Sequence, residues 1–203
     1  MIIRSNNIIF DVGGVLLDWQ PRSILQQFTD DKNLQEQVYR LMFKDTDWQR
    51  WDRGVISIQE LMEFTSRRVG LELREIERLM DLVRESLHLK LDSVTLLDEL
   101  HEKGYTMFCL SNMPREHYHV LSEQHDFWDR FAGVVISALV GWVKPEKEIY
   151  HHLLQQYDLA AENCVLVDDY IENIEAAEQI GMKGILFTSA EDCRQKILES
   201  RMA

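Results

Sequence analysis

Short apolar runs recur along the second half of the chain and alternate with segments of helical periodicity. The runs at 105–110, 134–137, 164–167 and 184–187 have the length of buried strands. Segments of helical spacing precede, separate and follow them, at 94–103, 116–125, 146–157, 171–180 and 191–200. This alternation predicts an α/β fold in which a parallel sheet is wrapped by helices.

A fifth run of the same character, 7–11, stands apart from the others. Residues from Pro21 to about His88 have helical patterns, including Ser57 followed by Glu60, the signature of a capping box. No convincing strand interrupts that stretch. The economical interpretation is one α/β core, formed by residues 1–17 and 91–203, with an all-helical insertion at 18–90.

Charge and composition narrow the class of protein. Lys and Arg total 22 against 35 Asp and Glu, a net charge of −13, in a chain of 203 residues. Such a balance argues against nucleic acid and against an anionic membrane surface as partners, because both require a basic face. No apolar run approaches the roughly 18 residues of a membrane helix.

The cysteines and the first residues of the chain indicate the cellular compartment in which the protein is expected. Residues 1–7 contain one cation and no apolar stretch of the length that a signal peptide needs. The three cysteines lack metal-ligand spacing, and Cys109 and Cys164 lie within apolar runs, where buried free thiols are expected. A reducing, cytoplasmic setting is therefore expected. The oligomer is left open between a monomer and a weak dimer.

Polar side chains follow four of the predicted strands. Asp11 follows the first, Ser111-Asn112 the second, Lys144-Pro145 lies just beyond the third, and Asp168-Asp169 follow the fourth, with Asn173 shortly after. Any one of these could be a turn or helix-cap residue. Ligands of open α/β sheets bind beyond the carboxyl ends of the strands, so the four together predict one site.

These motifs resemble the haloacid dehalogenase-like hydrolase superfamily over nearly the whole chain. The matching segments are 10–18, Leu110-Ser111-Asn112, 144–150, and Val167-Asp168-Asp169 with Asn173. Residues 51–57 are also similar to the cap of the branch that contains glucose-1-phosphate phosphatases and the phosphatase domain of soluble epoxide hydrolase. The resemblance implies a Rossmann-like core, a mobile helical cap, Mg²⁺ and an aspartyl-phosphate intermediate.

The resemblance also implies a role for each strand-end residue. Asp11 would be the nucleophile and a metal ligand, together with the Gly13 carbonyl and Asp169. Asp168 would either reach the metal through water or orient Lys144, and Asn173 would support these groups from behind.

Ser111, the Asn112 backbone N–H and Lys144 would hold the phosphoryl group that is transferred. Lys144 would neutralise the charge that spreads over this group in the transition state.

Gly13 departs from the family pattern, because most phosphatases of the superfamily carry an acid–base Asp there. General acid–base help is typically worth about 10²–10⁴-fold. Three explanations stay open: a good leaving group such as an anomeric sugar oxygen, a proton supplied by the cap or by metal-bound water, or a weakly catalytic or non-catalytic protein that binds a phosphorylated metabolite. The paired acids Asp168 and Asp169 favour phosphoryl chemistry over dehalogenation.

Tryptophans of the insertion are candidates for the specificity site. Trp19 and Trp51 could cover a sugar-like ring, and Trp48 would share a helix face with Trp51. Packing within the cap is the alternative. The sequence thus predicts a Mg²⁺-dependent phosphatase for a small phosphorylated metabolite, such as a hexose 1-phosphate.

Overall fold

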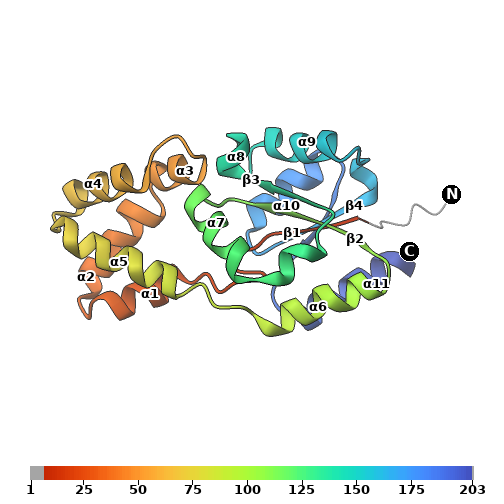
Figure 1. Cartoon of the computed structure of the whole chain (residues 1–203), viewed down its shortest axis with the longest axis horizontal. Helices are drawn as coiled ribbons and strands as arrows, with labels where there is room; N and C mark the ends of the chain where they lie inside the picture. The colour runs from red at the N-terminus through yellow and green to blue at the C-terminus, as the bar shows by residue number, and fades with distance from the viewer. Residues whose placement is uncertain (1–6, 203) are drawn as a thin grey trace.

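The computed structural model describes residues 7–202, and its centre is a five-stranded parallel sheet (Figure 1). The strands stand in the order β3-β2-β1-β4-β5. Their bounds are β1 Asn7–Phe10, β2 Thr106–Ser111, β3 Gly133–Ile136, β4 Cys164–Asp168 and β5 Lys183–Leu186. The strand at the start of the chain therefore lies in the middle of the sheet, as the separated apolar run at 7–11 predicts.

Side-chain alternation along the strands builds a core on each face of the sheet. Ile8 and Phe10 belong to one cluster, whereas Ile9 belongs to the other. Helices α6, α7 and α11 pack on the first face, and α9 and α10 on the second. Their bounds are α6 Leu91–Glu102, α7 Arg115–Gln124, α9 Lys147–Gln156, α10 Ile171–Gln179 and α11 Ala190–Met202. Both faces are buried, as a parallel sheet requires.

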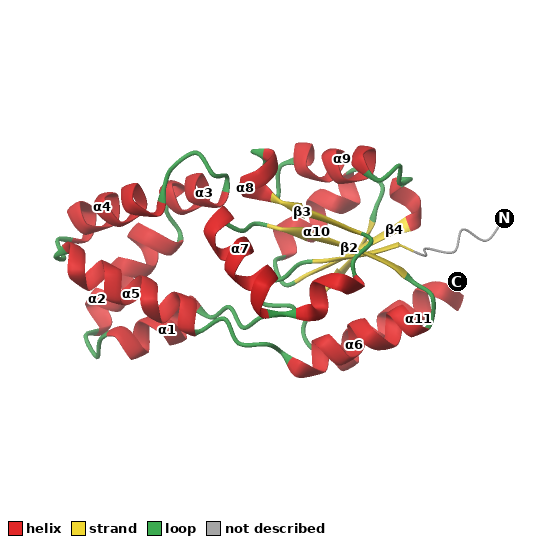
Figure 2. Cartoon of the chain, viewed as in Figure 1, coloured by secondary structure: helices red, strands yellow, loops and turns green. Residues whose placement is uncertain are grey.

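A helical cap region lies beyond the carboxyl edge of the sheet (Figure 2). It contains α1 Pro21–Phe28, α2 Lys32–Val38, a π-helical turn Tyr39–Phe43, α3 Thr46–Asp52, α4 Ile58–Val69 and α5 Leu73–Glu85. These helices bury a hydrophobic cluster of their own, separate from the two clusters of the sheet. The predicted capping box is confirmed: the Ser57 and Glu60 side chains each accept from the other's backbone N–H, and Gly70 ends α4.

Two connecting segments join the cap to the core, and they pair with each other. The Asp18 N–H donates to the His88 carbonyl (2.8 Å), and the Lys90 N–H donates to the Leu16 carbonyl (2.9 Å). The Lys90 ammonium also donates to the Gly14 carbonyl (2.7 Å), at the loop that follows β1. The connection is therefore a short two-chain ribbon tied to the loop that carries the candidate chemistry.

The strands predicted from sequence are confirmed to within one residue at each end. Short elements were not predicted: the π-helical turn, α8 Ser137–Val140, and 3₁₀ turns at Asp126–Arg130 and Ala161–Asn163. Cys109 and Cys164 are buried free thiols as expected. Between residues 7 and 202, no helix combines the length and apolarity needed to span a membrane. The start of the chain, residues 1–6, lies outside the described residues.

Candidate active site

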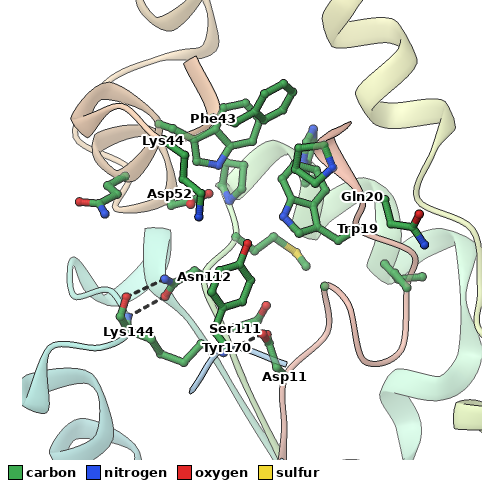
Figure 3. A pocket seen from close by; sticks show the side chains of 18 of the residues that line it. Asp11, Trp19, Gln20, Phe43, Lys44, Asp52, Ser111, Asn112, Lys144 and Tyr170 are labelled. Carbon is green, nitrogen blue, oxygen red and sulfur yellow. Dashed lines mark hydrogen bonds and ion pairs between the residues drawn. The ribbon is translucent and has the colours of Figure 1, made fainter. Parts of the chain in front are cut away.

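The residues predicted from the strand ends meet at one edge of the sheet. Asp11 follows β1 directly, Ser111 ends β2 and Asp168 ends β4. Lys144 reaches the same place from the loop between α8 and α9, and its side chain lies toward Asp11 in Figure 3. Parallel strands that share a direction put these four side chains together, although they are far apart in sequence.

A buried lysine ties two of the acids together. The Lys144 Nζ lies 2.9 Å from Asp11 Oδ2 and 2.6 Å from Asp168 Oδ2, and all three residues are buried. Burial alone would lower the pKa of Lys144, but the two carboxylates outweigh it and hold that pKa above its ordinary value. Lys144 therefore stays positively charged inside the site, where it can face a phosphate anion.

Two asparagines hold this ion cluster in place. The Asn112 carboxamide donates to the Lys144 carbonyl (2.9 Å) and accepts from the Lys144 N–H (2.7 Å). The Asn173 amide donates to both carboxylate oxygens of Asp168, at 2.9 and 3.1 Å. Because each asparagine makes two hydrogen bonds to one neighbour, the positions of Lys144 and Asp168 are set before any ligand binds.

Three acids offer a set of ligands for a divalent cation. One carboxylate oxygen from each of Asp11, Asp168 and Asp169 lies within 4.8 Å of the others. Burial and the neighbouring carboxylates raise the pKa of Asp169 to about 7, and burial raises that of Asp11 to about 6 despite Lys144. Asp169 Oδ1 is buried, and no described atom hydrogen-bonds to it. These hard oxygen donors fit Mg²⁺, whose charge would relieve the repulsion among them.

Gly14 leaves the space that Asp169 occupies. A Cβ at Gly14 would lie 2.1 Å from Asp169 Oδ2, and the backbone there has φ +75°. Both facts require glycine. At Gly13, by contrast, a Cβ would meet only Trp19 atoms at 3.7 and 3.8 Å, and φ is not in the left-handed region. The absence of an acid at Gly13 is therefore not forced by crowding.

A cavity of about 680 Å³ lies between the sheet edge and the cap. Asp11, Ser111, Asn112 and Lys144 line its floor. Aromatic and aliphatic side chains line much of the rest, among them Leu17, Trp19, Tyr39, Phe43, Trp48, Leu87, Met113, Leu121 and Tyr170. The site therefore combines a charged floor with a largely apolar wall.

The two tryptophans proposed for specificity lie in different places. Trp19 lines the cavity, and its ring contacts Trp48 at 5.6 Å and Phe43 at 6.0 Å between centroids. Trp51 is 1% exposed, is not among the lining residues, and packs between Trp48 and His117. This position is that of a packing residue behind the wall.

Most residues that line the cavity were not predicted from the sequence, among them an acid, a histidine and a tyrosine. Asp52 ends α3 on the cap side, His117 lies on α7, and Tyr170 precedes α10. His117 is buried and also borders the cavity. A signal existed only for Asp52, which belongs to the cap segment 51–57.

Comparison with known proteins agrees with this geometry. The model of the haloacid dehalogenase-like hydrolase family matches residues 6–181. The chain belongs to this family. A sesquiterpene phosphatase from Aspergillus oryzae is 32% identical over 182 residues, which are 90% of this chain and 89% of that protein. A drimenol cyclase from Aspergillus calidoustus is 24% identical, and the match spans 94% of this chain but 35% of the cyclase.

Solved structures show the same fold. An aspartate-to-alanine mutant of a family enzyme from Bacteroides thetaiotaomicron, in complex with magnesium and inorganic phosphate, superposes with a TM-score of 0.71 at 19% identity, over 90% of this chain and 94% of that one. An L-2-haloacid dehalogenase from Xanthobacter autotrophicus gives 0.66 at 15% identity, over 98% and 84%. The chain is thus a hydrolase of the haloacid dehalogenase-like family, with its core and cap.

Proposed function

We propose that the protein is a Mg²⁺-dependent phosphatase that hydrolyses an organic phosphate monoester through an aspartyl-phosphate on Asp11. The observation that carries this proposal is the cluster of Lys144 with Asp11 and Asp168, beside Asp169 with its unpaired oxygen. The hydrolysis of a haloacid would not need a third carboxylate such as that of Asp169. The chain is similar in sequence to a sesquiterpene phosphatase over most of the length of both proteins, and this similarity supports phosphoryl chemistry.

Asp11 would be the nucleophile. Its carboxylate attacks phosphorus, the bond from phosphorus to the organic oxygen breaks, and that oxygen takes up a proton. Water then attacks the aspartyl-phosphate, which returns the free carboxylate and releases inorganic phosphate. The Val12 N–H donates to Asp11 Oδ1 (2.7 Å), and this bond orients the carboxylate for attack.

Charge neutralisation would come from Lys144 and the bound ion. Asp11, Asp169 and the Gly13 carbonyl would hold Mg²⁺, with Asp168 alongside; the ion supplies charge neutralisation when two anions are brought together. Lys144 would bind the phosphoryl oxygens, with the hydroxyl of Ser111 and the backbone N–H of Asn112 as further donors. These roles follow the family pattern residue by residue.

The cavity wall favours an apolar organic group on the substrate. Trp19, Phe43 and Trp48 form a continuous aromatic surface, and Leu17, Leu87, Met113 and Leu121 also face the cavity. About 680 Å³ is room for a terpene-sized body. A prenyl-type phosphate therefore fits the wall, in line with the name of the sesquiterpene phosphatase.

A sugar phosphate such as a hexose 1-phosphate is the second candidate. Trp19 could cover a sugar ring, and Gln20, Gln49 and Asp45 at the cavity offer polar groups to hydroxyls. An anomeric oxygen is also a better leaving group than an ordinary alcohol, which suits a site with Gly13 in place of an acid.

Phosphate release from a substrate panel tests the proposal. The panel contains a small aryl phosphate, hexose phosphates and a prenyl monophosphate, each with Mg²⁺ and with EDTA. We expect turnover with Mg²⁺ only, the highest kcat/KM on the prenyl compound, and loss on the order of 10⁴-fold or more for Asp11→Asn. Binding of these phosphates without turnover by concentrated wild-type protein would instead support a non-catalytic phosphometabolite-binding protein.

A further inference from the structure

We infer that Asp52, at the end of α3 in the cap, is the general acid that protonates the leaving oxygen, in place of the acid that Gly13 lacks. The inference rests on the proposed phosphatase function. It adds a catalytic residue from the cap to a site whose other reacting groups all come from the sheet edge.

Asp52 is the acid of the cavity that is free for this task. The acidic side chains that line the cavity are Asp11, Asp45, Asp52 and Glu172. Asp11 is the nucleophile, Asp45 is paired with Arg68, and Glu172 is exposed. Asp52 is partly buried, has no cationic partner within ion-pair distance among the described residues, and lies across the cavity from Asp11 in Figure 3.

Contacts with the core hold this end of α3 over the site. The Ser137 hydroxyl donates to the Asp52 carbonyl (2.5 Å). The next residue, Arg53, donates to the Gly141 carbonyl (3.1 Å) and to Glu146 (2.9 Å). Gly54 then packs so closely that a Cβ there would lie 2.8 Å from the Ala138 carbonyl oxygen. Three consecutive residues therefore fix the cap at this point, so the backbone that carries the Asp52 side chain has a defined position over the site.

The surroundings of Asp52 keep its carboxyl protonated near neutral pH. Desolvation in the cavity wall and the negative charge of Asp11 raise its pKa to about 8, whereas Lys144 and a hydrogen bond from Trp48 act in the opposite direction. Other titratable groups border the cavity, among them Arg22, Tyr39 and Lys44 on the cap side and His117 on α7. Burial lowers the pKa of His117 to about 4, so it is neutral and does not replace Asp52 as the acid.

The proton balance is simple. When the bond from phosphorus to the leaving oxygen breaks, the Asp52 carboxyl gives its proton to that oxygen, and the product leaves as an alcohol. The Asp52 carboxylate then takes a proton from the water that attacks the aspartyl-phosphate, which restores the starting state.

Leaving-group dependence provides the test. We would measure kcat/KM of the wild type, Asp52→Asn and Asp52→Glu with Mg²⁺ on an alkyl phosphate and on an aryl phosphate whose phenolate leaves without protonation. We expect Asp52→Asn to lose about 10²-fold or more on the alkyl phosphate, but less than about 5-fold on the aryl phosphate. Asp52→Glu should recover part of the alkyl activity, because it restores a carboxyl group.

Asp81→Asn serves as the matched control, since Asp81 is an exposed acid of the cap on α5 and does not line the cavity. It should leave both activities unchanged. Equal losses on both substrates in Asp52→Asn, or no loss on either, would overturn the inference and leave the phosphatase proposal intact. If the wild type hydrolysed neither substrate, the phosphatase proposal itself would fail.

Discussion

The sheet edge and the cap wall face each other across one cavity, and they are built on different principles. At the sheet edge, Lys144, Asp168 and Asn173 hold each other through buried ion pairs and hydrogen bonds. On the cap side, Trp19, Phe43 and Trp48 contact one another through ring faces and edges. The ion cluster at the sheet edge holds the reacting groups in fixed positions, whereas the aromatic residues of the cap set the shape of the cavity that receives the substrate. Reaction type and substrate choice should therefore respond to different substitutions.

The largest effect should come from Trp51, which stands behind the cap wall. Trp51→Ala would leave a cavity beside Trp48 and His117 and should lower the free energy of unfolding by about 3–5 kcal/mol. Trp19→Ala, at the cavity surface, should cost less stability but raise KM for a bulky phosphate more than for a small aryl phosphate. Urea unfolding and steady-state kinetics measure both. Selective loss on bulky substrates in Trp51→Ala would mean that the ring contacts substrate.

The sheet-edge site could be predicted from sequence because the same pattern, a strand followed by a polar residue, recurs along the chain. Each strand is a short apolar run, and a parallel sheet brings the residue after each run to the same edge. Asp11, Ser111 and Asp168 therefore needed no knowledge of side-chain packing. Lys144 lies farther from its strand, across α8, and it was placed at the site because it accompanies the three other strand-end motifs.

The cap could be predicted as helices but not as a binding surface. Periodicity shows which residues of a helix are buried, but it does not show what buries them. Trp48 and Trp51 share one helix face, yet one lines the cavity and the other packs beneath it. The position of Asp52 depends on Ser137, Arg53 and Gly54, which are contacts between cap and core that no local pattern records.

Alanine substitutions at Gly14 and Gly70 test whether Mg²⁺ activation depends on the exact position of Asp169 at the sheet edge. Gly14→Ala would drive a methyl group into Asp169 and should weaken Mg²⁺ activation by about 10–100-fold. Gly70→Ala has the same kind of positive φ, +78°, with nothing within 4 Å of its Cβ. That control should lose about 1 kcal/mol of stability and keep its Mg²⁺ dependence. Titration of activity with Mg²⁺ separates the two, and equal Mg²⁺ curves would contradict the role of Asp169.

The pH dependence of stability should show a smaller effect, to which Asp169 at the sheet edge and Asp52 in the cap contribute over different pH ranges. Folding raises the pKa of Asp169 to about 7 and that of Asp52 to about 8, from 3.8. At these two carboxyls the folded protein therefore holds more protons than the unfolded chain between about pH 4 and 8, and their contribution to stability without metal should fall as pH rises.

Thermal melting in EDTA from pH 5 to 8 measures this fall. Asp169→Asn should remove the part that ends near pH 7, and Asp52→Asn the part that extends toward pH 8, each by a few degrees. Mg²⁺ should restore stability at the higher pH, because it binds the deprotonated acids. His117, whose pKa is lowered to about 4, acts in the opposite direction below about pH 6.5, so the comparison with the variants decides. A wild-type profile that is parallel to the profiles of both variants would show that these carboxyls are ionised throughout.

The smallest effect concerns the ion pair that joins the two regions, Arg53 with Glu146. Both side chains are partly exposed, at 26% and 35%, so the pair should contribute only about 0.5–1 kcal/mol to stability. A double-mutant cycle of Arg53→Ala and Glu146→Ala, read by urea unfolding, measures that coupling. Because the Ser137 bond and the Gly54 contact still hold α3 in these variants, activity on the alkyl phosphate should fall by less than about 5-fold. A loss as large as that of Asp52→Asn would show instead that this one pair holds the cap acid in place.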